Sequence, residues 1–177
     1  MRVKLTTNDL KLAESVARKR NKSQRDGERA DGKVMEDSLA IDIQGAEAEL
    51  AVAKALKLPW DGSFVKLDDW FDWRDNGHDV AGLEVRSTHH KRGSLILHPK
   101  DKDEAPFILV LTHERPYFNL VGWNFGREGK KDQYWRDVGY GRPCFYLPQN
   151  GLLDMSKLQA QIKERQGFSA AAPQEDK

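Results

Sequence analysis

Cysteine and long apolar runs are the features that this sequence of 177 residues has least of. Cys144 is the one cysteine, so the chain cannot form an internal disulfide or a zinc site built from several thiolates. No segment approaches the roughly 20 apolar residues of a membrane helix, and residues 1–12 carry no apolar run typical of a signal peptide. We therefore expect a cytoplasmic protein with no membrane partner, in which oxygen or imidazole ligands hold any metal.

Several catalytic motifs are also missing. The sequence contains no complete phosphate loop of the form GxxxxGKS or GxxxxGKT, no GxGxxG dinucleotide loop, no GxSxG nucleophile elbow and no HExxH or HxxxH metal pair. Nucleotide hydrolysis, dinucleotide binding, serine esterase chemistry and zinc hydrolysis therefore have no support. The net charge of only +1 argues against capture of nucleic acid over the whole surface.

Composition divides the chain into three segments. Residues 1–34 are predicted to be an N-terminal helix and a basic linker, residues 35–166 a core domain, and residues 167–177 a disordered tail. The first segment is locally cationic, with seven basic residues against three acidic ones between residues 16 and 34. A solvated helix end is the simpler interpretation of these charges, and contact with phosphate groups is the alternative. The basic residues that would make this contact are Arg18, Lys19 and Arg20.

The core domain has the pattern of an α/β fold. Apolar residues at helical spacing predict a helix over residues 36–58, and Pro59 is expected to end it. The later elements are expected to be strands at residues 83–88, 94–97, 107–112 and 118–123, a helix at 127–138, a strand at 144–147 and a closing helix at 152–165. The run FILVL is apolar without alternation, which predicts a central strand covered on both faces. This order predicts a mixed central sheet flanked by helices.

One predicted strand carries charges of both signs, in the stretch HDVAGLEVRSTHH of residues 78–90. Alternation places Glu84 and Arg86 together on one face of the strand. If Gly82 permits a tight bend, the carboxylates of Asp79 and Glu84 converge at one end of the sheet. Two carboxylates, a backbone carbonyl and water are ligands that Mg²⁺ commonly accepts. Taken alone, the pattern fits a strand edge stabilised by ion pairs better than it fits a metal site.

Two segments together resemble the PD-(D/E)xK nuclease superfamily, in particular its small phage- and prophage-type members. They are GAEAELAVAK, residues 45–54, and HDVAGLEVRS, residues 78–87. The similarity extends more loosely over residues 40–160. It implies a restriction-endonuclease-like core with the element order αβββαβ.

The resemblance also implies roles for individual residues. Glu49, Asp79 and Glu84 match the acidic positions of the family, and Arg86 stands where the family has a lysine. Asp79, Glu84 and the Val85 carbonyl would hold Mg²⁺ or Mn²⁺, and Glu49 would bind the ion directly or through water. A guanidinium cannot act as a base, but it can grip a phosphate oxygen. Activation of the nucleophile would then be left to the metal.

Two pairs of residues leave alternatives open. Glu47 and Glu49 flank the same apolar stripe of the helix, so helical geometry does not choose between them, and only the resemblance favours Glu49. His89 and His90 directly follow the charged strand. As adjacent strand residues they would face opposite ways, so at most one of them would face the site.

The implied activity is that of a Mg²⁺-dependent endonuclease that hydrolyses phosphodiester bonds, in DNA rather than RNA. Basic residues in the loops after the charged strand suit contacts with phosphate groups, and they are Lys91, Arg92 and Lys100. The second hypothesis is a non-cleaving module on the same fold that binds nucleic acid or protein, in which Arg86 marks lost catalysis. The third is an unrelated α/β protein. A homodimer is compatible with the sequence, which does not decide the oligomeric state.

Overall fold

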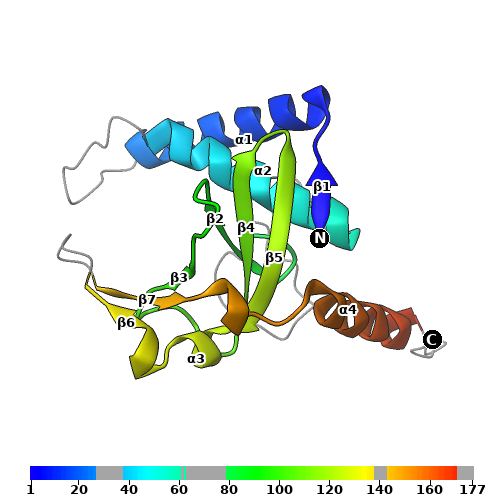
Figure 1. The fold of residues 1–177 in the computed structure, drawn as a ribbon. Coiled ribbons are helices and arrows are strands. Elements are labelled where there is room, and N and C mark those ends of the chain that lie inside the picture. The colour runs from blue at the N-terminus through cyan, green and yellow to red at the C-terminus, as the bar shows by residue number, and fades with distance from the viewer. Residues whose placement is uncertain (27–37, 61, 63–78, 138–142, 171–177) are drawn as a thin grey trace.

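A computed structural model describes residues 1–26, 38–60, 62, 79–137 and 143–170 of the chain (Figure 1). Its elements, in chain order, are β1 (Arg2–Lys4), α1 (Thr7–Asp26), α2 (Ser38–Leu56), β2 (Glu84–Thr88), β3 (Leu95–Leu97), β4 (Pro106–Glu114), β5 (Tyr117–Phe125), α3 (Gly126–Gly129), β6 (Trp135–Arg136), β7 (Cys144–Leu147) and α4 (Met155–Ala170). Two 3-10 turns, Asp132–Tyr134 and Gln149–Gly151, complete the set. No helix in the described part of the chain is both long and apolar enough to cross a membrane.

The larger sheet has four strands in the order β1-β5-β4-β2. β2 runs parallel to β4, whereas β4 and β5 are antiparallel, as are β5 and β1. The sheet is therefore mixed, as the sequence predicted. β2 lies at its edge, so one side of this strand has no neighbour among the strands that the structure describes. A second sheet has three strands in the order β3-β7-β6.

The central strand β4 separates two hydrophobic cores. Ile108 and Val110 point into the larger core, which includes residues of α1, α2 and α4, while Phe107 and Leu109 point into a smaller core shared with β3 and β7. This confirms the prediction that the run FILVL is covered on both faces. In Figure 1, α1 and α2 lie side by side across one end of the large sheet, and the small sheet lies at the other end.

Helix α2 ends before Pro59 for a local reason. Lys57 has a left-handed backbone with φ of 57°, and the Leu58 N–H donates to the Ala53 carbonyl at 2.9 Å. This bond across the helix end is that of a Schellman motif, with lysine in the position that glycine usually takes. The helix therefore stops at Leu56, and Pro59 follows a chain that has already turned.

The helix predicted for residues 127–138 is wrong. The structure has the four-residue helix α3 there, followed by a 3-10 turn and the short strand β6. The Gly126 and Arg127 N–H groups donate to carbonyls of Ala105 and Asp103, which ties the start of α3 to the loop before β4. Lys130 then leaves the helix, and its ammonium reaches the carbonyl of Asp101 at 2.5 Å. Tertiary contacts thus replace the continued helix.

Several predicted boundaries differ from the structure. α1 continues to Asp26, and α4 continues to Ala170, which lies inside the segment predicted to be disordered. The rest of the predicted linker and tail falls outside the described residues. Four strands separate α2 from α3 among the described residues, one more than the order αβββαβ has at that place.

Candidate functional site

A tight turn brings Asp79 to the edge of the large sheet. Ala81 and Gly82 both have positive φ, 44° and 84°, and Val80 and Leu83 exchange backbone hydrogen bonds across them at 3.1 and 2.8 Å. Positive φ at both central residues is the geometry of a type I′ turn, which reverses the chain within two residues. The bend expected at Gly82 is thus present.

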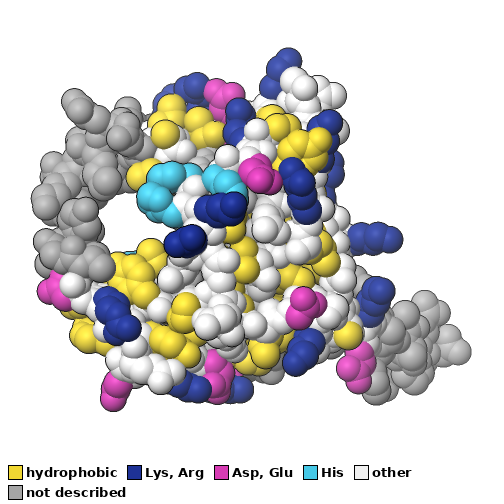
Figure 2. Space-filling view, in the orientation of Figure 1, with side chains coloured by type: hydrophobic (Ala, Val, Ile, Leu, Met, Phe, Trp, Pro, Cys, Tyr) yellow, Lys and Arg dark blue, Asp and Glu magenta, His cyan; other side chains and the backbone are white. Residues whose placement is uncertain are grey.

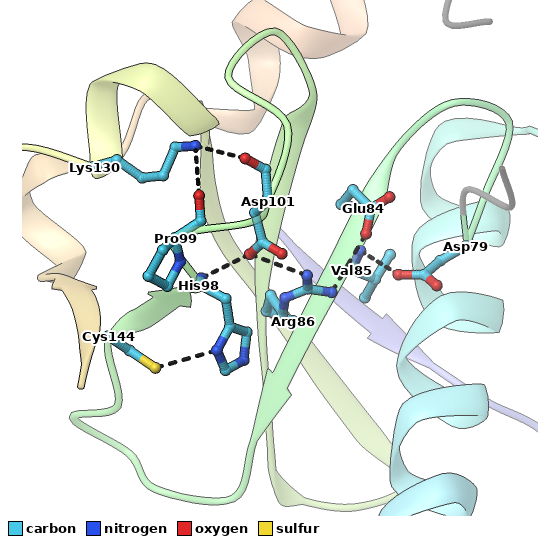
Figure 3. Close-up of polar contacts among 9 residues, drawn as sticks. All are labelled: Asp79, Glu84, Val85, Arg86, His98, Pro99, Asp101, Lys130 and Cys144. Carbon is cyan, nitrogen blue, oxygen red and sulfur yellow. Dashed lines mark hydrogen bonds and ion pairs between the residues drawn. The ribbon is translucent and has the colours of Figure 1, made fainter. Parts of the chain in front are cut away.

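The Asp79 carboxylate is held against the start of β2. Its Oδ2 accepts a hydrogen bond from the Val85 N–H at 2.8 Å (Figure 3). Its other oxygen accepts no hydrogen bond from the described residues. The N–H and carbonyl of a strand residue point to the same side, so the Val85 carbonyl faces the same open edge of β2. Two oxygens, from Asp79 and Val85, are therefore available at this edge.

Two further carboxylates lie close enough to Asp79 to change its protonation. Burial raises the pKa of Asp79, the negative charges of Glu49 and Glu84 raise it further, and together they bring it to about 7, although the Val85 N–H and Arg86 oppose the shift. Carboxyl groups whose ionisation is disfavoured by burial and by neighbouring negative charges are common in functional sites. A divalent cation among these three residues would remove the repulsion.

Helix α2 turns Glu47 and Glu49 toward different partners. Glu49 lies beside Asp79, and its two carboxylate oxygens accept hydrogen bonds from Arg20 and Trp60. Glu47 is bound instead by Arg115, with Nη2 donating to Oε1 at 2.8 Å. The ambiguity left by helical geometry is thus resolved by the neighbours: Glu49 is on the side of the candidate site.

Arg86 lies between two carboxylates. Its guanidinium is 3.4 Å from Glu84 and 3.3 Å from Asp101 (Figure 3). It also lies over the ring of Phe107, 5.1 Å from the ring centroid. Asp101 belongs to a loop that the ammonium of Lys130 binds through two backbone carbonyls. The Arg86 guanidinium is therefore held between the carboxylates of Glu84 and Asp101, and its side chain is still partly exposed.

Oxygen ligands gather at this edge without forming a complete metal site. Among the described residues, no three His, Cys, Asp or Glu side chains are arranged to hold a metal ion. Asp79, Glu84 and the Val85 carbonyl fit a hard cation such as Mg²⁺, because it accepts few protein oxygens and keeps several waters. Both oxygens of the Glu49 carboxylate already accept hydrogen bonds, from Arg20 and Trp60.

The residues predicted to contact nucleic acid divide into two groups. Lys91, Arg92, Lys100 and Lys19 are exposed. Arg18 is exposed and pairs with Glu14 on its own helix. Arg20 is different, because it points inward to Glu49.

His89 and His90 are both exposed, and their ring centroids are only 4.0 Å apart. The expectation that they face opposite ways is therefore wrong, because β2 ends at Thr88 and strand alternation stops there. In Figure 2, histidine side chains lie next to basic side chains over the part of the molecule that Figure 1 labels β2. This face suits an anionic partner.

Two residues of the site, Trp60 and Asp101, were not predicted from the sequence. Arg20 was predicted to contact phosphate groups, whereas in the structure it binds Glu49. The contacts of Arg20 with Glu49 and of Arg86 with Asp101 join residues 29 and 15 positions apart. Local periodicity carries no signal for such pairs. The one available hint for Asp101 was its place in a turn after Pro99 and Lys100.

The pKa of Asp79 predicts an unusual pH dependence of stability in the metal-free protein. The folded carboxyl, with a pKa of about 7, binds its proton more tightly than the unfolded one at 3.8. The free energy of unfolding should therefore fall as the pH rises from about 4 to about 7, and then level off. The side chain of Asp79→Asn cannot ionise. The free energy of unfolding of this variant, relative to that of the wild type, should therefore increase by on the order of 2 kcal/mol between about pH 5 and pH 8. Urea unfolding in EDTA measures the free energy of unfolding of both proteins at each pH. If the two plots of this free energy against pH are parallel, Asp79 does not have the raised pKa.

Comparisons with models of protein families, with curated proteins and with solved structures found no match. The resemblance to the PD-(D/E)xK superfamily stays a prediction from the motif residues. The geometry of the site is therefore the basis for assigning a function.

Proposed function

We propose that the protein is a metal-dependent nuclease that hydrolyses phosphodiester bonds in DNA. The observation that carries the proposal is the hydrogen bond from the Val85 N–H to Asp79 at 2.8 Å. It fixes one carboxylate at the open edge of β2, beside Glu84 on the same strand and Glu49 on α2. Carboxylates gathered at one edge attract a divalent cation, and a partly exposed arginine next to them suits a phosphate group.

Some residues of the site would bind the metal ion and others the substrate. Asp79, Glu84 and the Val85 carbonyl would hold Mg²⁺ or Mn²⁺. The bound ion would supply Lewis acidity toward the scissile phosphate and lower the pKa of a bound water. Arg86 would hold a nonbridging oxygen of the phosphate and stabilise the charge that develops there. Asp101 keeps the guanidinium of Arg86 beside the strand, at 3.3 Å, until substrate arrives.

A restriction-endonuclease-like core is part of this proposal. In support, a helix that carries Glu49 packs on a mixed sheet, and the edge strand of that sheet carries Glu84 and Arg86. The parallel pairing of β2 with β4 places the charged strand beside a fully covered central strand. The additional strand β3 and the small sheet around it would be elaborations of that core.

DNA is the proposed substrate because exposed cations follow the strand that carries Glu84 and Arg86. Lys91 and Arg92 lie in the turn that directly follows β2, and Gln149 fixes this turn by donating to the carbonyls of Lys91 and Gly93 at 3.0 Å. A fixed cationic turn can neutralise phosphates on one side of the scissile bond. Release of counterions would make binding strongly dependent on salt.

The test is a divalent-ion titration with labelled nucleic acid. We expect cleavage of DNA with Mg²⁺ or Mn²⁺ and none in EDTA, because the proposed mechanism leaves activation of the water to the ion. Duplex, single-stranded and branched DNA, with RNA of matched sequence, identify the preferred substrate. Cleavage in EDTA, or no cleavage of any substrate with either ion, would contradict the proposal.

A non-cleaving module that binds nucleic acid is the second candidate. It is favoured by the absence of a complete metal site among the described residues and by the arginine at position 86. Under this hypothesis the protein binds DNA with the same affinity in EDTA and in Mg²⁺. The titration above separates the two candidates, because only the nuclease gives products.

A further inference from the structure

Glu49 is bound by a buried arginine that comes from a different helix. Arg20 of α1 donates from Nη1 to Oε1 and from Nη2 to Oε2, both at 2.8 Å, and from Nε to the Gly62 carbonyl at 3.0 Å. The side chains of Arg20 and Glu49 are only 14% and 7% exposed. A guanidinium that pairs with both oxygens of a carboxylate fixes the orientation of that carboxylate as well as its charge.

A second donor restricts Glu49 further. The Trp60 indole N–H donates to Oε2 at 2.9 Å, so this oxygen accepts two hydrogen bonds while Oε1 accepts one. A carboxylate oxygen has about two lone-pair positions. Oε2 is therefore saturated, and Oε1 has one position left. Because the Arg20 cation lies 2.8 Å from Oε1, that position favours a neutral donor over a second, divalent cation.

We propose that Arg20 is a positioning residue of the nuclease site, which holds Glu49 so that its Oε1 accepts a hydrogen bond from a water molecule on the metal ion. Asp79 and Glu84 then ligate the ion directly, and Glu49 does not. The inference rests on the proposed nuclease function. It makes α1 part of the active centre, although the sequence suggested a separate N-terminal arm.

The close packing of α1 supports this role. Gly62, whose carbonyl accepts from Arg20, has a φ of 71°, and a Cβ there would clash with the Val16 side chain of α1. The chain after α2 therefore lies directly against α1. Burial lowers the pKa of Arg20, but the hydrogen bonds and negative charge of Glu49 outweigh this effect, and the negative charge of Asp79 raises the pKa further. The guanidinium is thus within the field of the site.

The same helix offers a matched control. Glu47 is buried like Glu49 and is bound through both oxygens by one arginine, Arg115, at 2.8 to 3.1 Å. This pair does not involve Asp79 or Glu84. Arg115→Gln therefore removes an ion pair from α2 without touching the candidate site, whereas Arg20→Gln removes the pair that holds Glu49.

The experiment measures binding of Mn²⁺ and steady-state cleavage of DNA. Glu84→Gln removes a direct ligand and should weaken binding of Mn²⁺ by at least about 100-fold, whereas Glu49→Gln should weaken it by no more than about tenfold, the lower end of the usual effect of losing a group outside the ligand set. Arg20→Gln should lower kcat by about 10- to 100-fold with little change in KM and no loss of Mn²⁺ affinity. Arg20→Lys keeps the charge without the two-pronged contact, so its kcat should fall nearly as far.

Equal loss of Mn²⁺ binding in Glu49→Gln and Glu84→Gln would overturn the inference, because Glu49 would then be a direct ligand. Equal kcat per folded molecule in Arg20→Gln and Arg115→Gln would also overturn it. If Arg20→Gln does not fold, Trp60→Phe decides, since it removes one donor to Glu49 and keeps the ring, and an unchanged kcat would refute the role of this carboxylate. A wild-type protein that neither binds Mn²⁺ nor cleaves DNA would overturn the proposed function, and this inference with it.

Discussion

Glu84→Gln is expected to reduce the rate of DNA cleavage by about 10³-fold, because a metal ion supplies several kcal/mol of transition-state stabilisation that this ligand makes available. Glu84 lies on β2 and acts electrostatically on Asp79, so the two carboxylates share one small region. Glutamine has nearly the same shape but carries no charge, and it binds Mg²⁺ much more weakly. Single-turnover cleavage with saturating protein measures the loss at the chemical step.

Glu114→Gln is the control for this substitution. Glu114 also lies on the large sheet, at the end of β4, but its side chain is exposed and pairs with Arg2 at 3.2 Å. Losing an exposed ion pair costs little. We expect cleavage by Glu114→Gln to equal that of the wild type. Cleavage by Glu84→Gln at the rate of the control would show that Glu84 is not a metal ligand.

Arg86→Gln is expected to reduce cleavage by about 100- to 1000-fold, the usual effect of losing a cationic group that stabilises a transition state. The guanidinium lies 3.4 Å from Glu84 and is still partly exposed, and Asp101 and the ring of Phe107 fix its direction. Arg86→Lys keeps a positive charge on a flexible stem and reproduces the lysine of the family motif. It should retain activity within about tenfold of the wild type, because a point charge still meets the phosphate.

The two Arg86 variants also separate the two candidate functions. If Arg86→Lys cleaves as fast as the wild type or faster, the site accepts the chemistry of the PD-(D/E)xK motif. If Arg86→Gln binds and cleaves DNA like the wild type, Arg86 serves only to tie β2 to the loop of Asp101. Anisotropy of labelled DNA, measured beside the cleavage rates, shows whether the loss lies in binding or in the chemical step. Arg127→Gln, at an exposed ion pair with Glu104, controls for the lost charge.

The fold could be predicted where one local pattern determines the structure. The unbroken apolar run of β4 and the helical stripe of α2 both correspond to structural elements. The short strand β1 was missed because three residues, Arg2–Lys4, are too few to show alternation, and pairing with β5 creates the strand. The wrong helix at residues 127–138 shows the converse, since local sequence allowed a helix that the contacts of Lys130 do not permit.

In the candidate site, too, the features set by local sequence could be predicted and the features set by tertiary packing could not. Asp79 and Glu84 could be brought together from sequence because Gly82 permits a turn within the local chain. The partners of Glu49 and Arg86 could not, because Arg20 and Asp101 reach them only after α1 and the loop before β4 are packed. The sequence therefore indicates the groups that carry charge, whereas packing decides which of them are held by a partner.

The position of the metal ion is the measurement that tests this account most directly. A crystal grown with Mn²⁺ should show an anomalous peak for one ion, with carboxylate oxygens of Asp79 and Glu84 at about 2.1 Å from it. The carboxylate of Glu49 should stay paired with Arg20 and contact a water molecule on the ion. No ion at this edge of β2, or an ion bound directly by Glu49 after its pair with Arg20 is broken, would contradict the arrangement proposed for the site.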